Sequence, residues 1–491
     1  MMSQVHLAPL RDRALGPLSS SLARKLRLLD SLVQTSACDL PTLAVRSSLG
    51  TARAIALLGR CLPRSLASVA CSTHSSRHRR AIYRRSRCAY GHGVIEVVGI
   101  AATGWQSLAP PEQRLVKEAQ LVLGGARHLA LLPEITGQTQ VRLPADLRAT
   151  LPALVAGHQD RRIVVLASGD PLLYGIGSTL IELFGTDSVQ IHPALSSVAL
   201  AAARMGWAAG SYEVVRIRTR ELDEIRRHLA PGRRLLILSR DGSTPLLMSQ
   251  LLDEVGFGSS KITVLAELGS GAESRWDERW PAEVPDLNIV CLTCQADRLS
   301  GAWSAAAGLP DESFDHDGQL TKRDMRASAL AHLMPVPGQL LWDVGAGAGS
   351  IAIEWLRAHP LCRAIAIERD PARVKRIRLN ATRLGVPELK VIEGEAPTAL
   401  DGLPAPDAVF LGGGESPMTV ETCWATLKAG GRLVGHAVTL QTEAVLADCW
   451  RRLGGELTRM SIEWMRPIGS YDGWQPARPI VQWAVQKPLG Q

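Results

Sequence analysis

The chain has 491 residues, of which 46% are hydrophobic and 21% charged, and its formal net charge is +8. This composition is typical of globular proteins with large apolar cores, and the length predicts two to four domains at roughly 150 residues each. No charge-free apolar run approaches the about 18 residues that a membrane helix needs. The sequence therefore excludes a spanning segment and favours a cytoplasmic protein.

The positive charge belongs to the first 92 residues. They contain 15 Lys and Arg against 3 Asp and Glu, a net charge of +12, whereas the rest of the chain carries −4. Three interpretations stay open: a disordered basic arm that binds nucleic acid or anionic surfaces, a transit peptide, or translation upstream of a true start near Val94. We favour the last, because the charge bias stops where regular patterning starts.

From Val94 onward, short apolar runs alternate with helix-like stretches such as 112–119, which predicts an α/β fold with a largely parallel sheet. The strands predicted in the first half are 94–100, 121–125, 162–167, 189–192, 234–238, 261–265 and 288–292. Functional residues are expected in the loops that follow the carboxyl ends of these strands.

Turn and cap residues follow three of these strands. Gly99 ends the first strand, and Gly169-Asp170-Pro171 forms a tight turn in which the proline suits helix entry. Ser196 and Ser197 stand at a helix start. Asp170 and the two serines are also good helix caps by residue type alone, so capping and ligand binding both stay open here.

A looser stretch, 298–314, contains glycine and proline and is predicted to be a linker. The strands predicted in the second half are 340–344, 364–368, 389–392, 407–411 and 431–435, and two β-rich stretches, 456–465 and 479–487, suit an antiparallel pair.

The most informative stretch follows the strand at 340–344, where Gly345, Gly347 and Gly349 alternate. A dinucleotide-binding turn instead has the spacing G-x-G-x-x-G and seats a pyrophosphate, which Asp343 would repel. Glu368 ends the next strand and is placed to accept ribose hydroxyls. These features favour S-adenosylmethionine over NAD, although Asp343 would also serve as a simple turn cap.

Cys291 and Cys294 have metal-like spacing, but no second pair accompanies them. In a strand these positions point to opposite faces. We interpret both as core residues, expect reduced thiols as in the cytosol, and predict no metal site.

Two motif sets resemble known families. Residues 94–297 resemble the tetrapyrrole methylases through the Gly99 turn and the motifs Ser168-Gly169-Asp170-Pro171, Pro193-Ala-Leu-Ser196-Ser197 and Ser239-Arg-Asp241-Gly242. Residues 315–350 resemble the C15-methylating, decarboxylating enzymes of cobalamin biosynthesis through Gly318-Gln319-Leu-Thr321-Lys322 and the glycine turn.

The order of the two sets is similar to that of the fused precorrin-6B C5,15-methyltransferases (decarboxylating), over about four-fifths of the chain. One position departs: Gly99-Ile100-Ala101 stands where the family usually has Gly-Ile-Gly.

The resemblance implies an N-terminal tetrapyrrole methylase fold at 93–297 and a class I, Rossmann-like methyltransferase domain at 315–491. It implies methylation of precorrin-6B at C5 and C15 with S-adenosylmethionine and loss of the ring-C acetate carboxyl, giving precorrin-8X. The partners implied are the tetrapyrrole and further copies of the chain, with no membrane and no nucleic acid.

The residues then expected to bind the cofactor are Gly99, Gly169, Asp170, Pro171, Ser196, Ser197, Gln319, Thr321, Asp343, Gly345, Gly347, Gly349, Glu368 and Glu395. Lys322 and Arg326 are candidates for holding substrate carboxylates, although a solvated helix face would look the same. His436 is a candidate proton donor for the decarboxylation, although a single histidine after a strand is commonly structural.

Three other functions stay open at this point. They are a methyltransferase for another small molecule or for RNA, a nucleic-acid-binding protein led by the basic arm, and an NAD-dependent oxidoreductase.

Overall fold

The computed structural model describes residues 94–158, 160–217, 222–297, 304–413 and 416–490. The basic segment 1–92, with the three interpretations that it leaves open, lies outside the described residues, and so does the first part of the predicted linker, 298–303. Within the described ranges, no helix is long and apolar enough to cross a membrane.

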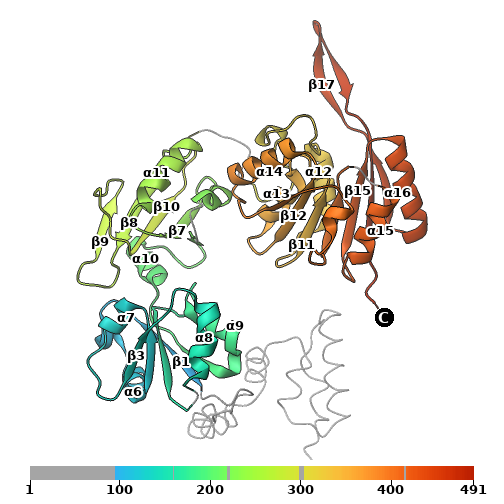
Figure 1. Cartoon of the computed structure of the whole chain (residues 1–491). Coiled ribbons are helices and arrows are strands. Elements are labelled where there is room, and N and C mark those ends of the chain that lie inside the picture. Colours follow the sequence, from blue (N-terminus) through green and yellow to red (C-terminus); the bar gives the residue numbers. More distant parts are fainter. Residues whose placement is uncertain (1–93, 159, 218–221, 298–303, 414–415, 491) are drawn as a thin grey trace, which may run out of the picture. The chain divides into compact units, whose positions relative to one another are not determined.

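The first half opens with a five-stranded sheet in the order β3-β2-β4-β1-β5, in which all neighbouring strands are parallel (Figure 1). Its strands are β1 (Ile95–Ile100), β2 (Leu121–Gly124), β3 (Thr139–Arg142), β4 (Ile163–Ser168) and β5 (Val189–His192). The helices around it are α6 (Pro110–Glu118), α7 (Ala126–Ala130), α8 (Leu147–Ala156) and α9 (Ile176–Phe184). Leu151 of α8 and Leu180 of α9 pack on one face of the sheet, and Val116 of α6 packs on the other. This part confirms the predicted parallel α/β alternation.

A second sheet has the order β6-β7-β10-β8-β9. Its strands are β6 (Glu213–Arg216), β7 (Arg234–Leu238), β8 (Lys261–Ala266), β9 (Ser274–Asp277) and β10 (Asn288–Thr293), with helices α10 (Ser197–Met205) and α11 (Thr244–Glu254). Only β6 and β7 are parallel; the other neighbours are antiparallel. The prediction of one largely parallel sheet is therefore wrong here. No helix separates β8, β9 and β10, and strands without a crossover helix pair antiparallel.

The burial of Cys291 and Cys294 confirms their interpretation as core residues. Cys291 packs in the cluster on the α10 face of this sheet, whereas Cys294 belongs to the cluster on the α11 face. Burial raises the pKa of Cys291 to about 12 and that of Cys294 to about 11. Neither is a ready metal ligand, because metals bind the thiolate.

The second half contains a seven-stranded sheet in the order β13-β12-β11-β14-β15-β19-β16. Its strands are β11 (Leu340–Val344), β12 (Arg363–Glu368), β13 (Lys390–Glu393), β14 (Ala408–Leu411), β15 (Arg432–Ala437), β16 (Glu456–Met460) and β19 (Ile480–Gln486). The five strands from β13 to β15 are parallel, and β19 runs antiparallel to both of its neighbours. The predicted antiparallel end of the domain is thus confirmed.

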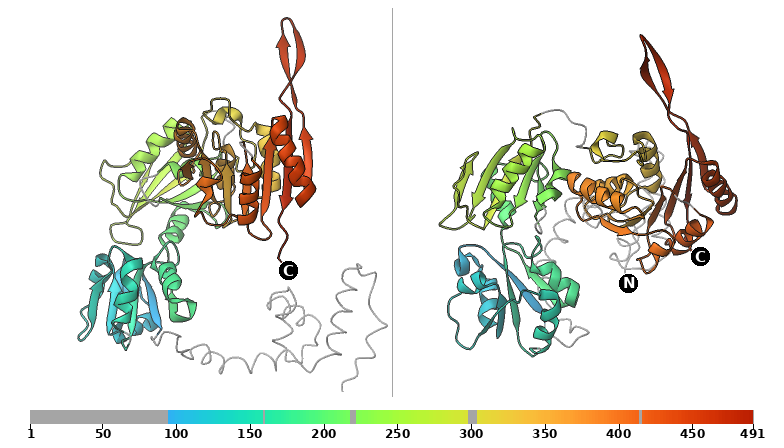
Figure 2. Two further views of the ribbon diagram at one scale, coloured as in Figure 1. Left: turned by 45° about the vertical axis from the view of Figure 1, so that its right-hand side comes forward. Right: turned by 45° about the horizontal axis from the view of Figure 1, so that its top comes forward.

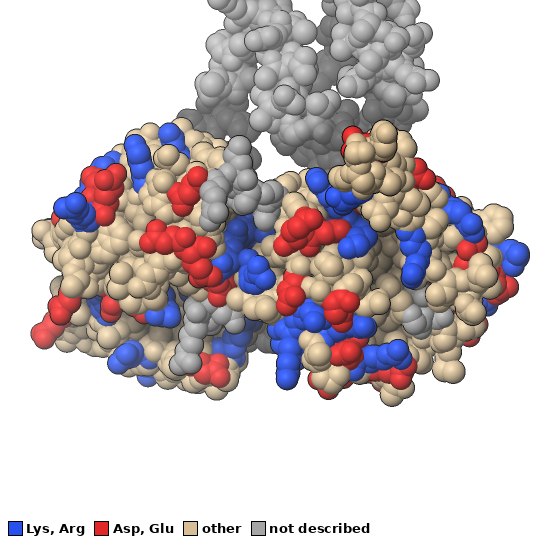
Figure 3. All heavy atoms as spheres, turned by 90° about the horizontal axis from the view of Figure 1, so that it is seen from above, with Lys and Arg blue, Asp and Glu red and all other residues tan. Residues whose placement is uncertain are grey.

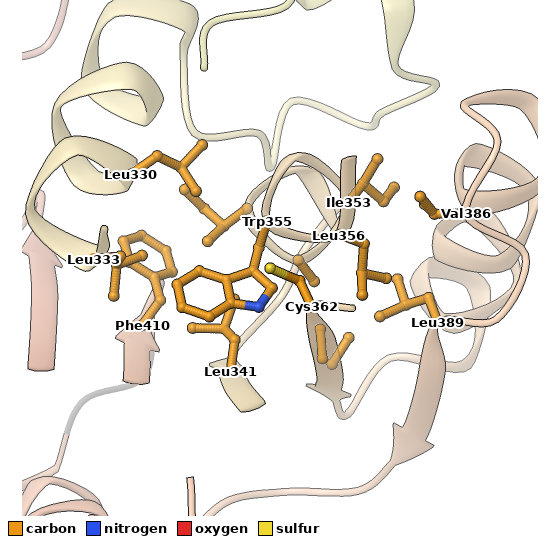
Figure 4. Close-up of a cluster of buried hydrophobic side chains, with 14 of the residues drawn as sticks. Leu330, Leu333, Leu341, Ile353, Trp355, Leu356, Cys362, Val386, Leu389 and Phe410 are labelled. Carbon is orange, nitrogen blue, oxygen red and sulfur yellow. The ribbon is translucent and has the colours of Figure 1, made fainter. Parts of the chain in front are cut away.

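Helices cover both faces of this sheet. They are α12 (Arg323–Leu333), α13 (Ser350–Ala358), α14 (Pro371–Arg383), α15 (Pro417–Thr426) and α16 (Leu440–Leu453). Trp355 of α13 is fully buried, and Figure 4 shows its ring between Leu330 and Leu333 of α12 and Leu341 of β11. Leu446 of α16 packs in the cluster on the opposite face.

A hairpin that the sequence analysis missed projects beyond this sheet (Figures 1 and 2). Its strands, β17 (Glu463–Ile468) and β18 (Tyr471–Pro476), form a separate two-stranded sheet. The stretch predicted as one β-rich segment, 456–465, is divided between β16 and β17. Alternating apolar residues do not reveal whether a strand stays in the sheet or leaves it.

The end of the predicted linker belongs to the core of the second half. Leu309 and Phe314 are only 2% and 4% exposed and pack with α12 and α13. A short 3-10 helix, η5 (Asp311–Ser313), lies between them.

Arg326 of α12 fastens this segment. Its side chain is fully buried, and its Nε donates to Oε1 of Glu354 at 2.5 Å. Its Nη1 donates to Oδ1 of Asp311 at 3.1 Å, and it also donates to the carbonyls of Thr321 and Leu309. Every end of this guanidinium is bound by the chain. Arg326 is therefore neither a solvated surface residue nor a free contact for a substrate carboxylate.

We expect Arg326→Met to lower the free energy of unfolding by about 3–5 kcal/mol, because it leaves Glu354 as an uncompensated buried charge. Denaturant unfolding of the full chain measures this. The double variant Arg326→Met/Glu354→Gln should regain part of the loss, since it removes that charge and keeps an acceptor for the Leu309 amide. Equal stability of Arg326→Met and the native chain would contradict the buried ion pair.

Candidate functional site

The glycine turn of the second half lies between β11 and α13. Gly345, Gly347 and Gly349 have φ angles of +69°, +59° and +78°. A residue with a Cβ pays about 1–2 kcal/mol for this left-handed conformation. Three alternating glycines therefore permit a turn that leads directly into the N-terminus of α13.

Two of these glycines are also points of close backbone approach. A Cβ on Gly345 would lie 2.6 Å from the carbonyl oxygen of Gly413, in the loop after β14, and one on Gly347 would lie 2.8 Å from that of Gln319. The strand order of the sheet reverses between β11 and β14. Open α/β sheets bind their ligands at such a switch point. The structure thus brings Gly345, Gly347 and Gln319 together where a ligand is expected.

Asp343 lies directly beneath the turn and is 1% exposed. Its Oδ2 accepts a hydrogen bond from the Ala352 amide at 3.0 Å, so it does cap the start of α13. Its buried Oδ1 has no hydrogen-bond partner among the described residues. Burial, with a smaller contribution from the charge of Glu368, raises the pKa of Asp343 to about 7. An unpaired buried carboxylate oxygen favours a ligand that brings a positive charge or an N–H donor.

Glu368, at the end of β12, holds the same turn from the other side. Its Oε2 accepts from the Gly347 amide at 2.9 Å, and its Oε1 accepts from the Asp370 amide at 3.0 Å. The carboxylate is 5% exposed. It fixes the turn whether or not a ligand is present, and contact with a ribose stays a prediction.

The segment that carries Gln319 is anchored by Asp317, which the sequence analysis missed. Oδ1 of Asp317 accepts from the Gln319 amide at 3.1 Å, and Oδ2 pairs with Arg373 of α14 at 2.9 Å. The hydrogen bond from Arg373 holds the pKa of Asp317 well below its usual value. An Asp two residues before Gln319 was a visible local turn signal.

Asn380, also missed, ties the same segment to the glycine turn. It is fully buried in α14, and its Nδ2 donates to the carbonyls of Asp315 at 2.9 Å and Ala348 at 3.0 Å. Its Oδ1 accepts from the Asp315 amide at 2.9 Å. Nothing in the sequence distinguishes this asparagine from a surface residue of the helix.

Three further candidates have protein partners of their own. The Thr321 carbonyl accepts from Arg326. Lys322 is partly exposed and lies 3.6 Å from Asp311. Glu395, placed at the adenine edge by the sequence analysis, is 71% exposed and pairs with Arg369 at 3.0 Å on the surface.

His436 of β15 points into the core. It is 6% exposed, its Nε2 bonds Oε1 of Gln482 at 2.9 Å, and its ring meets Phe410 edge to face. Burial lowers the pKa of His436 to about 4. The ring is therefore neutral near pH 7 and has no proton to spare, so the structure favours the structural alternative.

The first half contains a cavity of about 250 Å³ at the carboxyl ends of β1, β4 and β5. Of the residues predicted there, Gly169, Asp170, Ser196 and Ser197 line it. Ser196 also caps α10, accepting from the Ala199 amide at 3.1 Å, so capping and lining coincide in one residue.

Gly99 lies where three turns of the first half meet. A Cβ there would overlap the carbonyl oxygen of Gly169 and lie 2.7 Å from the Ala194 nitrogen. The Gly169 amide donates to the carbonyl of Ile100 at 3.1 Å, and the Ala194 amide donates to that of Gly169 at 3.1 Å. Gly99 thus permits the close packing of these turns.

The cavity wall after β1 is formed instead by the residues that follow Gly99. Ile100, Ala101 and Ala102 line it. Alanine at the position where the family usually has glycine is therefore accommodated with the cavity still open.

Two family models match the chain. Tetrapyrrole (Corrin/Porphyrin) Methylases match residues 94–279, and Precorrin methyltransferase domain matches residues 312–487. A precorrin-6Y C(5,15)-methyltransferase (decarboxylating) from Sinorhizobium sp is 46% identical over 400 residues, which are 80% of this chain and 96% of the relative. This chain belongs to the precorrin-6Y C5,15-methyltransferase (decarboxylating) family.

A family member from Mycobacterium tuberculosis is 42% identical over 402 residues, 80% of this chain and 100% of the relative. Among solved structures, the C-terminal domain of a family member from Rhodobacter capsulatus is 43% identical, with a TM-score of 0.36, and covers 38% of this chain and 100% of its own.

Asp343 gives a pH-dependent prediction. Because its pKa is raised in the folded state, its ionised form destabilises the ligand-free protein, starting above about pH 4 and complete above about pH 7. Asp343→Asn should therefore gain about 3 kcal/mol of stability relative to the native chain between pH 5 and pH 8, because about two of these pH units lie below the raised pKa and each contributes about 1.4 kcal/mol. Denaturant unfolding at both pH values measures this difference.

A pH-independent effect of the Asp343→Asn amide on the free energy of unfolding cancels, because the comparison is between the two pH values. The exposed control Asp401→Asn should follow the native pH dependence. Parallel stability curves for Asp343→Asn and the native chain would refute the raised pKa.

Proposed function

We propose that this chain is a bifunctional C-methyltransferase that uses S-adenosylmethionine to methylate precorrin-6B at C5 and C15. It also removes the ring-C acetate carboxyl as carbon dioxide, giving precorrin-8X in cobalamin biosynthesis. The first half acts at C5, and the second half acts at C15 and decarboxylates. The observation that carries this proposal is that one chain holds two different loop clusters at strand carboxyl ends, each inside its own family match.

We propose the division 1–92 extension, 93–297 tetrapyrrole methylase, 298–314 linker and 315–491 class I, Rossmann-like methyltransferase. Support for the last comes from the strand order β13-β12-β11-β14-β15 and the antiparallel β19 at its edge. The packing of Leu309 and Phe314 moves the structural start of the second half a few residues earlier.

The residues at the glycine turn fit S-adenosylmethionine. The absence of Cβ atoms at Gly345 and Gly347 lets the turn pack against the carbonyls of Gly413 and Gln319, and the buried Oδ1 of Asp343 is an acceptor with no partner among the described residues. When bound, the cofactor supplies a methyl group on a positively charged sulfur. The chain then has to align donor and acceptor carbon, and alignment alone contributes about 7–11 kcal/mol in well-oriented systems. A turn held by hydrogen bonds to Glu368 and Asp343 suits that task.

The decarboxylation needs groups that hold a carboxylate. With Arg326 fully engaged, Lys322 remains the candidate beside the Gln319 segment, since its side chain is 44% exposed. Its amine at the start of α12 can reach a carboxylate of the bound tetrapyrrole and keep it oriented.

Separate observations count against the alternative functions. Membership of a methyltransferase family removes the NAD-dependent oxidoreductase. The basic arm lies outside the described residues, and on the face shown in Figure 3 acidic and basic side chains are interspersed. That face therefore offers no support for a nucleic-acid ligand. A methyltransferase for another small molecule remains the alternative that the product assay decides.

We also propose that the protein acts in the cytoplasm and self-associates through the β17–β18 hairpin. An isolated two-stranded hairpin is marginally stable in water, and this one exposes Ile468 (63%), Tyr471 (80%) and Trp474 (63%). Pairing with the same hairpin of a second copy would bury these side chains and extend both sheets.

The product assay incubates the full chain with precorrin-6B and labelled S-adenosylmethionine and measures the product mass. We expect a gain of two methyl groups and loss of one carbon dioxide. Gly169→Ala, whose Cβ would lie 2.7 Å from the Leu195 carbonyl oxygen, should suppress only the C5 methylation by tenfold or more. Gly345→Ala should suppress the C15 methylation and carbon dioxide release. A native chain that leaves precorrin-6B unchanged would overturn the proposed function.

Self-association is measured by light scattering during size exclusion. The double variant Tyr471→Ser/Trp474→Ser should shift the chain to a smaller species while its circular dichroism stays native. The control Leu361→Ser, at a leucine outside the hairpin that is as exposed as Trp474, should keep the native mass. An unchanged mass for the hairpin variant would exclude this surface.

A further inference from the structure

A polar cluster stands at the cavity of the first half, and two of its three members, Arg127 and His128, lie outside the motifs that the sequence analysis singled out. Nη2 of Arg127 donates to Oγ of Ser168 at 2.9 Å, and Nε2 of His128 forms a hydrogen bond with the same oxygen at 2.7 Å. Arg127 and Ser168 line the cavity, and both are exposed. Ser168 ends β4 immediately before Gly169 and Asp170.

The charges around this cavity are unevenly placed. Its lining carboxylates are Asp170, Glu267 and Asp286, and Arg127 is the one cation among the residues that line it. Within the described part of the chain, no carboxylate forms an ion pair with Arg127. Its hydrogen bond to Ser168 leaves most of the five guanidinium N–H donors available.

His128 supports this arrangement through its hydrogen bond with the Ser168 hydroxyl. Burial, and then the charge of Arg127, lowers the pKa of His128. The ring is therefore neutral near pH 7 and does not act as a second cation. It orients the Ser168 hydroxyl, which in turn holds the Arg127 guanidinium at the cavity.

We propose that Arg127, oriented by Ser168, binds an acetate or propionate carboxylate of the tetrapyrrole and so sets which carbon meets the methyl donor in the first half. A planar guanidinium binds a carboxylate with two parallel hydrogen bonds, which fixes orientation as well as position. The lining acids suit the cationic donor, whereas the exposed arginine suits the polyanionic acceptor. This inference rests on the proposed function and names the residue that positions its substrate.

A carboxylate is also present on the methionine end of the donor, so the test must separate the two sources. Steady-state kinetics of C5 methylation by the full chain give KM for precorrin-6B and kcat. Calorimetry with S-adenosylhomocysteine gives Kd for the donor site. The C15 methylation and carbon dioxide release of the second half serve as an internal control in every sample.

We expect Arg127→Gln to raise KM for precorrin-6B at least about tenfold, the scale of a lost charge-assisted hydrogen bond. Arg127→Lys should recover part of this loss, because it restores the charge but not the planar fork. Ser168→Ala should give a smaller rise of about threefold, since the cation stays but loses its support. The donor Kd and the reactions of the second half should stay unchanged.

The matched control is Arg162→Gln. Arg162 adjoins the amino end of β4, the end of the strand opposite Ser168, and its exposed pair with Glu118 contributes little. This variant should keep all native parameters.

An unchanged KM for precorrin-6B in Arg127→Gln would overturn the proposed role of Arg127, whether or not the Kd of the donor weakens. Fluorescence quenching by precorrin-6B separates this inference from the proposed function. If the native chain transfers no methyl group but Arg127→Gln still weakens the quenching by precorrin-6B, the carboxylate-binding role of Arg127 is supported and the proposed reaction is contradicted. If the native chain makes the full product and Arg127→Gln binds precorrin-6B as tightly as the native chain does, only the carboxylate-binding role of Arg127 is contradicted.

Discussion

Close contact between backbone turns is the constraint on which both halves of this protein depend. In the first half, the turns after β1, β4 and β5 meet so tightly that Gly99 has no room for a Cβ. In the second half, the turn after β11 meets the loop after β14 at Gly345 and the incoming segment at Gly347. Glycine makes these contacts possible because backbone atoms can touch without an intervening side chain. The resulting turns are held by the chain's own contacts.

Buried charge is used in two different ways around the second of these sites. The polar groups of the Arg326–Glu354 pair are all bound by the chain, and Arg326 also donates to the carbonyls of Thr321 and Leu309. Asp343 is left incomplete, with one oxygen bonded to α13 and the other unpaired. A buried ion pair whose polar groups are all bonded stabilises the fold. A buried carboxylate with one unpaired oxygen favours a ligand that brings a hydrogen-bond donor or a positive charge.

The two halves reach a similar arrangement on different sheets. Both place loops at the carboxyl ends of parallel strands, but the first half combines a parallel sheet with a mixed one and the second uses a single seven-stranded sheet. A reaction that modifies one macrocycle at two carbons does not require one fold. It requires two donors, each aligned with its own carbon, and each half supplies that alignment with its own turns.

The sequence by itself determined most strand positions of the parallel regions, although it missed β3 and β6, and it determined the glycine turn, the core role of Cys291 and Cys294, and the family. These features are local: apolar runs, turn glycines and motif spacing are written in consecutive residues. Only the tertiary structure decided that the sheet of β6 to β10 is mixed, that β17 and β18 leave the domain as a hairpin, and that Arg326 and His436 are buried. It also revealed Asn380 and Arg127. The physical reason is that burial and hydrogen-bond partners depend on residues far apart in the chain, such as Arg127 and Ser168, which no local pattern connects.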